Sequence, residues 1–281
     1  MSKKRVVVWA SLLVAATVVA DEAALEKKAE LEVSGWVNPE FESAHASMGV
    51  VKIAYPVFNV DFGLSAQIQE GRYGRLLFGT WTCTDLSNHY RDARRNAFQE
   101  IDPLIAYAYT LHFYEGWSLD SQWGAQWNIM DGYRGSGRHT YDEWQFWERL
   151  KTPWGTTIYA GMRNFYLPVT KASVRTGITH AFAITDALSF VPNLWFDAGS
   201  ERWNTQRFGY GPSASEISGG FNSLSLQLFL NYRLTDWVRL YGGVTQYCAT
   251  DHHVRGNLKA NPSRESVTEL MIVTLGARFE F

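Results

Sequence analysis

The chain has 281 residues, of which 46% are hydrophobic and 15% aromatic, and its 26 basic and 28 acidic residues give a net charge of −2. This composition allows a folded interior in one or two domains, whereas the near-neutral charge provides no basic surface for nucleic acid. The 23 glycines and 8 prolines are too few for a collagen-like or disordered chain, and a mean hydropathy of −0.21 excludes a bundle of membrane helices.

The chain begins with the pattern of a secretory signal peptide. A short basic stretch at residues 3–5 precedes an apolar run over residues 6–20, and Val18 and Ala20 occupy the −3 and −1 positions of a signal-peptidase site. The apolar run is shorter than the ~20 residues that a membrane-spanning helix needs. We therefore expect cleavage after Ala20 and export of the remaining chain.

Most of the remaining chain alternates apolar and polar residues with a period of two, which indicates half-buried β-strands. In residues 119–129, for example, Trp123 lies on the apolar face and Gln126 on the polar face, and residues 58–69 and 224–233 repeat this alternation. A soluble sandwich can carry such strands. Most of the segments, however, are longer than the usual ~5–6 residues of a strand and about as long as a tilted strand needs to cross a bilayer.

In chain order, the alternating segments predict twelve strands. We expect them at residues 30–46, 57–69, 73–84, 103–114, 117–129, 142–151, 155–166, 173–184, 187–198, 221–234, 236–248 and 267–281. The first is the least regular because Pro39 interrupts it, and residues 48–55 form either a separate strand or part of the first loop.

The connections between these strands alternate in length. Short turns are expected at residues 70–72, 115–116, 152–154, 185–186 and 235–236. Longer polar loops are expected at residues 85–102, 131–141, 167–172, 199–220 and 249–264. Short turns on one side and long loops on the other are typical of a bacterial outer-membrane barrel.

The last strand carries a resemblance to a known class of proteins. Alternate residues from Met271 to Phe281 are apolar, and the strand finishes on the aromatic residues Phe279 and Phe281. This resembles the C-terminal signal by which outer-membrane barrel proteins are recognised by their assembly machinery. In size and strand number the chain is similar to the twelve-stranded channels and enzymes of Gram-negative outer membranes, although no motif ties it to one member.

The resemblance implies an all-β fold: a transmembrane antiparallel up-and-down β-barrel in the cell outer membrane, with short periplasmic turns and long extracellular loops. Its partners would be outer-membrane lipid and the assembly machinery. We expect residues 1–20 to be the signal peptide, residues 21–29 a short periplasmic segment and residues 30–281 the barrel. Trp117, Trp154 and Trp237 flank short turns and fit an aromatic girdle at the periplasmic interface.

If apolar faces point to lipid, the alternation assigns the polar residues of each strand to the lumen. The charged and amide residues assigned to it are Asp61, Gln67, His112, Asp120, Gln126, Arg163, Arg175, Asp197, Arg233, Arg239, Arg278 and Glu280. The aromatic residues assigned to it are Trp147, Tyr159, Phe165, Trp195, Phe229, Tyr241 and Tyr247. The charges would either set the selectivity of a pore or form a salt-bridged plug, and the rings would either stack on sugars or nucleosides or fill a narrow lumen. Twelve strands permit both an open and a filled barrel.

Three functions follow from this assignment. The first is a passive channel for small polar solutes of the sugar or nucleoside class. The second is a closed barrel with a structural or surface-binding role carried by its long loops. An outer-membrane hydrolase is the third; we do not expect an enzyme, because His180 has no evident nucleophile partner and the loop histidines have the solvated surroundings of ordinary loops.

The remaining reactive residues predict no cofactor. The pair His252 and His253 is too small to be a metal site without further ligands, and the sequence has no phosphate-binding or dinucleotide motif. Cys83 and Cys248 fall on strands that are not neighbours in the predicted barrel, so we expect two free thiols.

Overall fold

The structure is a computed structural model, and it describes residues 31–47, 50–68, 73–87, 99–131, 139–164, 171–209, 214–260 and 267–281. The predicted signal peptide, the predicted periplasmic segment, Phe165 and parts of the predicted loops lie outside these residues. None of the helices among the described residues has the length and apolarity to cross a membrane.

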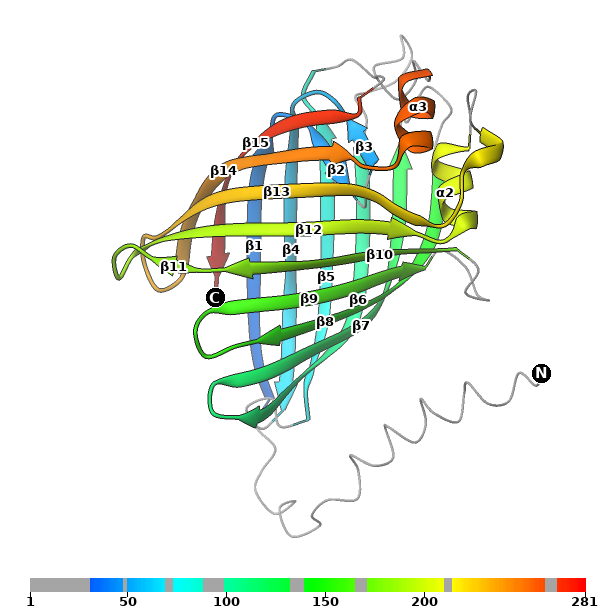
Figure 1. Cartoon of the computed structure of the whole chain (residues 1–281). Coiled ribbons are helices and arrows are strands. Elements are labelled where there is room, and N and C mark those ends of the chain that lie inside the picture. Colours follow the sequence, from blue (N-terminus) through cyan, green and yellow to red (C-terminus); the bar gives the residue numbers. More distant parts are fainter. Residues whose placement is uncertain are drawn as a thin grey trace, which may run out of the picture.

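A single antiparallel sheet forms almost the whole structure (Figure 1). Its strands are β1 (Leu31–Glu42), β4 (Val57–Ile68), β5 (Arg75–Asp85), β6 (Gln99–Tyr114), β7 (Trp117–Asp131), β8 (His139–Lys151), β9 (Thr156–Asn164), β10 (Ala172–His180), β11 (Phe182–Ala183), β12 (Leu188–Gly199), β13 (Gly220–Arg233), β14 (Val238–Ala249) and β15 (Glu269–Glu280). The two-residue β11 follows β10 directly and pairs with β12, so it occupies no position of its own in the wall. The remaining twelve strands match the twelve predicted from sequence.

The sheet closes on itself. Strand β1 pairs with β4 on one side and with β15 on the other, and β10 pairs with both β9 and β12. Every strand of the wall therefore has two hydrogen-bonded neighbours, which is what a sheet surrounded by lipid requires. Pro39, which lacks an N–H, is paired with Val60 of β4 but falls in a gap of the pairing with β15, between Val37 and Glu40.

The two ends of the barrel differ. Short turns join the strands at one end, which also holds both Leu31 and Phe281; we call it the turn end. Three glycines at this end have a positive φ, Gly74 at 79°, Gly116 at 72° and Gly155 at 83°, a conformation that other residues adopt at a cost. The long connections lie at the opposite end, which we call the loop end.

The two faces of the wall separate apolar from polar side chains. Large apolar residues on one face are exposed, for instance Leu64 at 48%, Trp123 at 55% and Leu275 at 59%. Polar residues on the other face are buried, for instance Glu143 and Asp197, each at 2%. An apolar exterior around a polar interior is the arrangement of a barrel that lies in a bilayer, so the predicted fold class is confirmed.

The loop end carries the other elements of secondary structure. The connection from β1 to β4 contains a hairpin of β2 (His45–Ser47) and β3 (Val50–Ile53), which pair only with each other. The connection from β12 to β13 contains helix α2 (Glu201–Phe208) and the 3-10 turn η3 (Ala214–Glu216), and helix α3 (His252–Ala260) lies between β14 and β15. The second strand proposed near residues 48–55 is therefore real, but it is not part of the barrel wall.

Two predicted loops need correction because they contain helices. Side-chain oxygens cap both helices: Ser200 accepts a hydrogen bond from the N–H of Trp203, and Asp251 accepts one from the N–H of Val254. A third correction concerns the loop predicted over residues 85–102, because β6 already begins at Gln99.

Candidate functional site in the barrel interior

The interior near the loop end contains a hydrogen-bonded network that spans β6 to β9. Gln126 donates through Nε2 to Oδ2 of Asp102 at 2.7 Å, and Gln145 donates through Nε2 to Oε1 of Gln126. Beside them, Nε of Arg163 lies 2.8 Å from Oε1 of Glu143. The structure thus places Gln126 and Arg163 in one buried network, with three residues that the sequence analysis did not select.

Arg175 and Asp197 form a second buried group. They are directly opposite in the pairing of β10 with β12, and Arg175 donates through Nε and Nη2 to the two carboxylate oxygens at 2.8 and 3.1 Å. Ser223 donates to Oδ2 of Asp197 at 3.1 Å, and the guanidinium carbon lies 4.8 Å from the ring centre of Trp195. The bidentate geometry fixes both side chains, so these predicted residues form one rigid unit on the wall.

Two interior carboxylates, Glu40 and Asp61, lie on the wall formed by β14, β15, β1 and β4 and are held by neutral donors. Tyr241 donates through Oη to Oε2 of Glu40 at 3.0 Å. Asp61 accepts hydrogen bonds at 3.0 Å from both Trp36 Nε1 and Asn38 Nδ2. Neither the Glu40 nor the Asp61 carboxylate has an ion-pair partner within 4.0 Å among the described residues. Neutral donors therefore hold both carboxylates in place, and two residues of this group, Tyr241 and Asp61, were predicted from the sequence.

Between the charged groups, neutral side chains form a ladder from β9 to β14. Tyr159 donates to Oδ1 of Asn193 at 2.9 Å, Asn193 donates to Oε1 of Gln227 at 3.4 Å, and Gln227 donates to Oγ1 of Thr245 at 3.3 Å. Amide and hydroxyl groups in such a row can exchange hydrogen bonds with the hydroxyls of a polar solute.

Several interior aromatic rings lie over glycines of the neighbouring strand. A β-carbon on Gly161 would collide with the ring of Trp147, and one on Gly276 would collide with the ring of Tyr241. The same relation joins Tyr159 to Gly177. Because glycine has no side chain, each ring can approach the backbone closely, and it leans along the wall instead of projecting across the interior.

Charged side chains at the turn end are more accessible to water. Asp120 pairs with Lys151 at 2.6 Å, and the Lys151 side chain is 51% exposed. Arg239 and Arg278 both contact Glu280, at 3.5 and 2.7 Å, and their side chains are 54% and 47% exposed. The basic side chains of this end are therefore solvated, in contrast to the buried pairs of the loop end.

The sign of the interior charge changes along the barrel. Toward the loop end the register places the acids Glu40, Glu42, Glu100, Asp102, Glu143 and Asp197 with the bases Lys52, Arg163 and Arg175. Toward the turn end it places the bases Arg75, Arg149, Lys151, Arg233, Arg239 and Arg278 with the acids Glu32, Asp120 and Glu280. Such a separation gives the interior an electric field along its axis.

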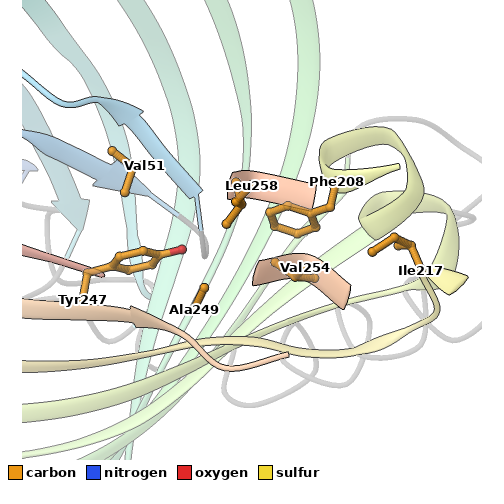
Figure 2. Packing of buried hydrophobic residues seen from close by; sticks show 7 residues of the cluster. All are labelled: Val51, Phe208, Ile217, Tyr247, Ala249, Val254 and Leu258. Atoms are coloured by element: carbon orange, nitrogen blue, oxygen red, sulfur yellow. The ribbon is translucent and has the colours of Figure 1, made fainter. Parts of the chain in front are cut away.

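A cap of packed side chains lies at the loop end, where the hairpin β2–β3 and the helices α2 and α3 are (Figure 2). Its buried apolar residues come from β3, α2, α3, β14 and the segment after η3, and they are Val51, Phe208, Ile217, Tyr247, Ala249, Val254 and Leu258. Lys52 holds the hairpin to the wall through an ion pair of 3.1 Å with Glu100, which is fully buried. Asn257 of α3 donates to the carbonyl oxygen of Phe208 at 2.9 Å, which joins the two helices.

Polar contacts at the edge of the cap join α3 to η3 and to the start of β15. His253 Nδ1 lies 2.7 Å from Oε2 of Glu216, between α3 and η3. Arg255 donates to Oε1 of Glu269 at 2.8 Å, and this hydrogen bond raises the pKa of the Arg255 guanidinium above its ordinary value. The connections after β12 and β14 thus fold back over the loop end and are fastened to it.

Sequence reasoning missed several buried charged residues of this interior. Glu100 and Asp102 follow the alternation of β6 and lie on its inner face. Pro103 interrupts the alternation in the sequence, so we assigned both residues to a loop. Glu143 shares its parity with Trp147, so the alternation that selected Trp147 also contained the signal for Glu143. No sequence signal indicated Lys52, whose partner is distant in the chain.

The reactive residues fall into separate places. Oγ1 of Thr156 lies 2.7 Å from Nδ1 of His180 on the outer face near the turn end, a hydroxyl partner that the sequence analysis did not find. Among the described residues, no carboxylate or amide is hydrogen-bonded to this imidazole, although hydrolases of this type use such a third group.

Cys83 and Cys248 are both free, as predicted. The described part of the chain contains no group of three or more histidine, cysteine or acidic residues arranged for a metal ion.

A scan against protein-family models finds no match, and neither does a search of the curated proteins. Among solved structures, the KdgM porin in complex with disordered oligogalacturonate is 8% identical, with a TM-score of 0.45 and coverage of 88% of this chain and 99% of that chain. The NanC porin is 10% identical, with a TM-score of 0.49 and coverage of 86% and 98%. Outer membrane phospholipase A from Escherichia coli is 12% identical, with a TM-score of 0.42 and coverage of 88% and 92%. These likenesses add nothing to the fold that the strand register already establishes.

The class of the protein follows from its own structure. Lipid provides no hydrogen-bond partners for the backbone, and a closed sheet needs none. The apolar outer face and the polar inner face complete the requirements of a membrane barrel. The chain is a β-barrel protein of the outer membrane.

Proposed function

We propose that the protein is a passive outer-membrane channel for small polar solutes. The observation that carries this proposal is the exposure of charged side chains on the inner face. Lys151 and Arg239, for example, are half-exposed although they point away from lipid. A barrel filled with packed side chains would bury such groups in ion pairs. The interior at the turn end thus has the character of an aqueous vestibule.

The middle of the barrel supports a sugar or nucleoside as the solute class. The row of Tyr159, Asn193, Gln227 and Thr245 offers hydroxyl and amide groups at one level of the wall. Trp147 lies over Gly161 near this level, so one side of the ring is against the backbone. A ring in that position can present its other side to the apolar face of a sugar or a base.

Selectivity in this proposal belongs to the predicted lumen residues. Asp61, Gln126, Arg163, Arg175 and Asp197 line the path toward the loop end. Asp120, Arg233, Arg239 and Arg278 line it toward the turn end. The separation of acids from bases along this path favours solutes that are polar and neutral or dipolar, since a single charge is attracted at one end and repelled at the other.

The cap supports a second candidate function, a closed barrel that acts through its loops. Val254 and Leu258 of α3 are each 2% exposed and belong to one packed cluster with Phe208 of α2 and Tyr247 of the wall. If this packing persists in the membrane, the loop end is sealed and the rim formed by α2 and α3 is the surface available to partners.

Conductance in planar bilayers separates the two candidates. The chain without its predicted signal peptide would be refolded in detergent, checked for a heat-dependent shift on a gel, and added to a planar bilayer. Stable openings that sugars or nucleosides interrupt support the channel. A folded barrel without openings overturns it and leaves the closed barrel.

A further inference from the structure

Three arginines face one another across neighbouring strands near the turn end. Arg233 of β13 is directly opposite Arg239 of β14, and Arg239 is directly opposite Arg278 of β15. Directly opposed residues have β-carbons about 4.5–5.5 Å apart, so the three side chains form a row about 10 Å long. We call Arg233, Arg239 and Arg278 the arginine row.

The row is only partly neutralised. Glu280 is its one carboxylate side chain in the described structure, and it contacts Arg278 at 2.7 Å and Arg239 at 3.5 Å. Arg233 has no carboxylate within 4.0 Å there and donates instead to the backbone oxygen of Asp186 at 3.0 Å. Each guanidinium carries five N–H groups, so most donors of the row are left to water.

This arrangement is costly for the fold alone. Like charges directly opposite on neighbouring strands destabilise a sheet, and two such contacts occur side by side. The arginines of the loop end are arranged differently, because Arg163 and Arg175 each have their own buried carboxylate, Glu143 and Asp197. The network that stabilises the wall there is absent from the arginine row.

A ligand with negative charge would relieve this repulsion. From the register, the exposure and the missing counter-charges, we propose that the arginine row binds small anions with two or more negative charges, of the phosphate or carboxylate type. Two neighbouring guanidinium groups can donate in parallel to the oxygens of such an anion. The site lies at the turn end, outside the cap, so it is open to solutes whether or not the barrel conducts.

The opposite wall adds to the attraction. Arg75, Arg149 and Lys151 lie near the turn end on β5 and β8, and Asp120 is the acid that interacts with all three. A second basic group across the opening raises the local concentration of anions and speeds their encounter with the row. We assign the hydrogen bonds to the bound anion to the arginine row, and not to this second basic group, because the members of the row are directly opposed.

Binding of inorganic pyrophosphate to the refolded barrel, measured by titration calorimetry at low salt, tests the proposal. Citrate and chloride serve as comparison anions. We expect pyrophosphate or citrate to bind and chloride not to compete at equal concentration; the better of the two identifies phosphate or carboxylate as the preferred chemistry. Arg239→Gln, in the middle of the row, should weaken binding more than tenfold. Arg255→Gln removes one charge from the loop end and should leave binding unchanged.

The folding of the variants does not limit this test. Arg239→Gln removes both like-charge contacts, so we expect the variant barrel to be at least as stable as the wild type. Arg233→Gln removes only one contact and should weaken binding less. Equal affinities of Arg239→Gln and wild type, an equal loss in Arg255→Gln, or no binding of either pyrophosphate or citrate by wild type at millimolar concentration would each overturn the proposal. Since binding is measured without a membrane, a non-conducting barrel refutes the channel and leaves this site standing.

Discussion

Removal of the Asp197 carboxylate should strongly destabilise the barrel. Asp197 is 2% exposed, accepts two hydrogen bonds from Arg175 and one from Ser223, and is too buried for solvent to replace these partners. Removing one member of a buried ion pair costs about 3–5 kcal/mol, because the other charge remains buried and uncompensated. For Asp197→Ala we therefore expect the free energy of unfolding to fall by about 3–5 kcal/mol.

Asp120→Ala is the matched control. Asp120 also pairs with a basic residue on the inner face, but its partner Lys151 is 51% exposed and keeps its hydration when the carboxylate is removed. Solvent-exposed pairs contribute about 0–1 kcal/mol, so the loss should stay near this range. The measurement is urea unfolding of each refolded variant in lipid vesicles, followed by tryptophan fluorescence.

A second substitution tests the cause of the loss. Replacing Arg175 by Met in the Asp197→Ala background removes the uncompensated charge and should recover part of the lost stability. The double variant would then be more stable than the sum of the two single losses predicts. Equal losses in Asp197→Ala and Asp120→Ala would refute the reasoning, since burial would not decide the strength of these pairs.

Three further outcomes are expected. Gly161→Val should force the ring of Trp147 off the wall and cost about 1–3 kcal/mol of unfolding free energy in the same assay; an unchanged stability would mean that the ring has room elsewhere. Val254→Asp places a charge in the buried cap and should raise single-channel conductance if the cap limits the path, whereas unaltered currents would show that it does not. Wild-type barrel should hydrolyse a phospholipid ester no faster than the double variant Thr156→Ala/His180→Ala; a faster wild-type rate would establish an enzyme.

The barrel wall could be predicted from sequence because membrane strands obey a strict alternation. Residues such as Phe62 and Asp61 had to fall on opposite faces once lipid surrounds the sheet, and the even number of strands follows from turns and loops that alternate in length. The structure has the expected twelve strands, and their ends differ from the prediction by only a few residues at most positions. The exception is β6, which begins at Gln99 and not at residue 103, because Pro103 interrupts the alternation near the start of the strand.

The alternation in the sequence could not predict which interior side chains contact one another. Parity shows which face a residue occupies, but not which neighbour it meets, because that depends on the register between strands. Arg175 and Asp197 were both selected, yet nothing in the sequence places them opposite each other. The helices of the loop end were missed for another reason: α2 and α3 are short, and the capping residues Ser200 and Asp251 at their N-termini are weak local signals.

The two ends of the interior use charge in different ways. At the loop end the wall residues Arg163 and Arg175 are each matched to a buried carboxylate, so these charges are fixed and stabilise the wall on which the cap rests. At the turn end the arginine row shares Glu280, repels itself and faces water, so its energy is lowest when an outside anion is present. A solute that enters from the turn end therefore meets solvent-exposed, partly neutralised groups first and a buried, neutralised network last. Stability measured at Asp197 and anion binding measured at Arg239 should accordingly vary independently of each other.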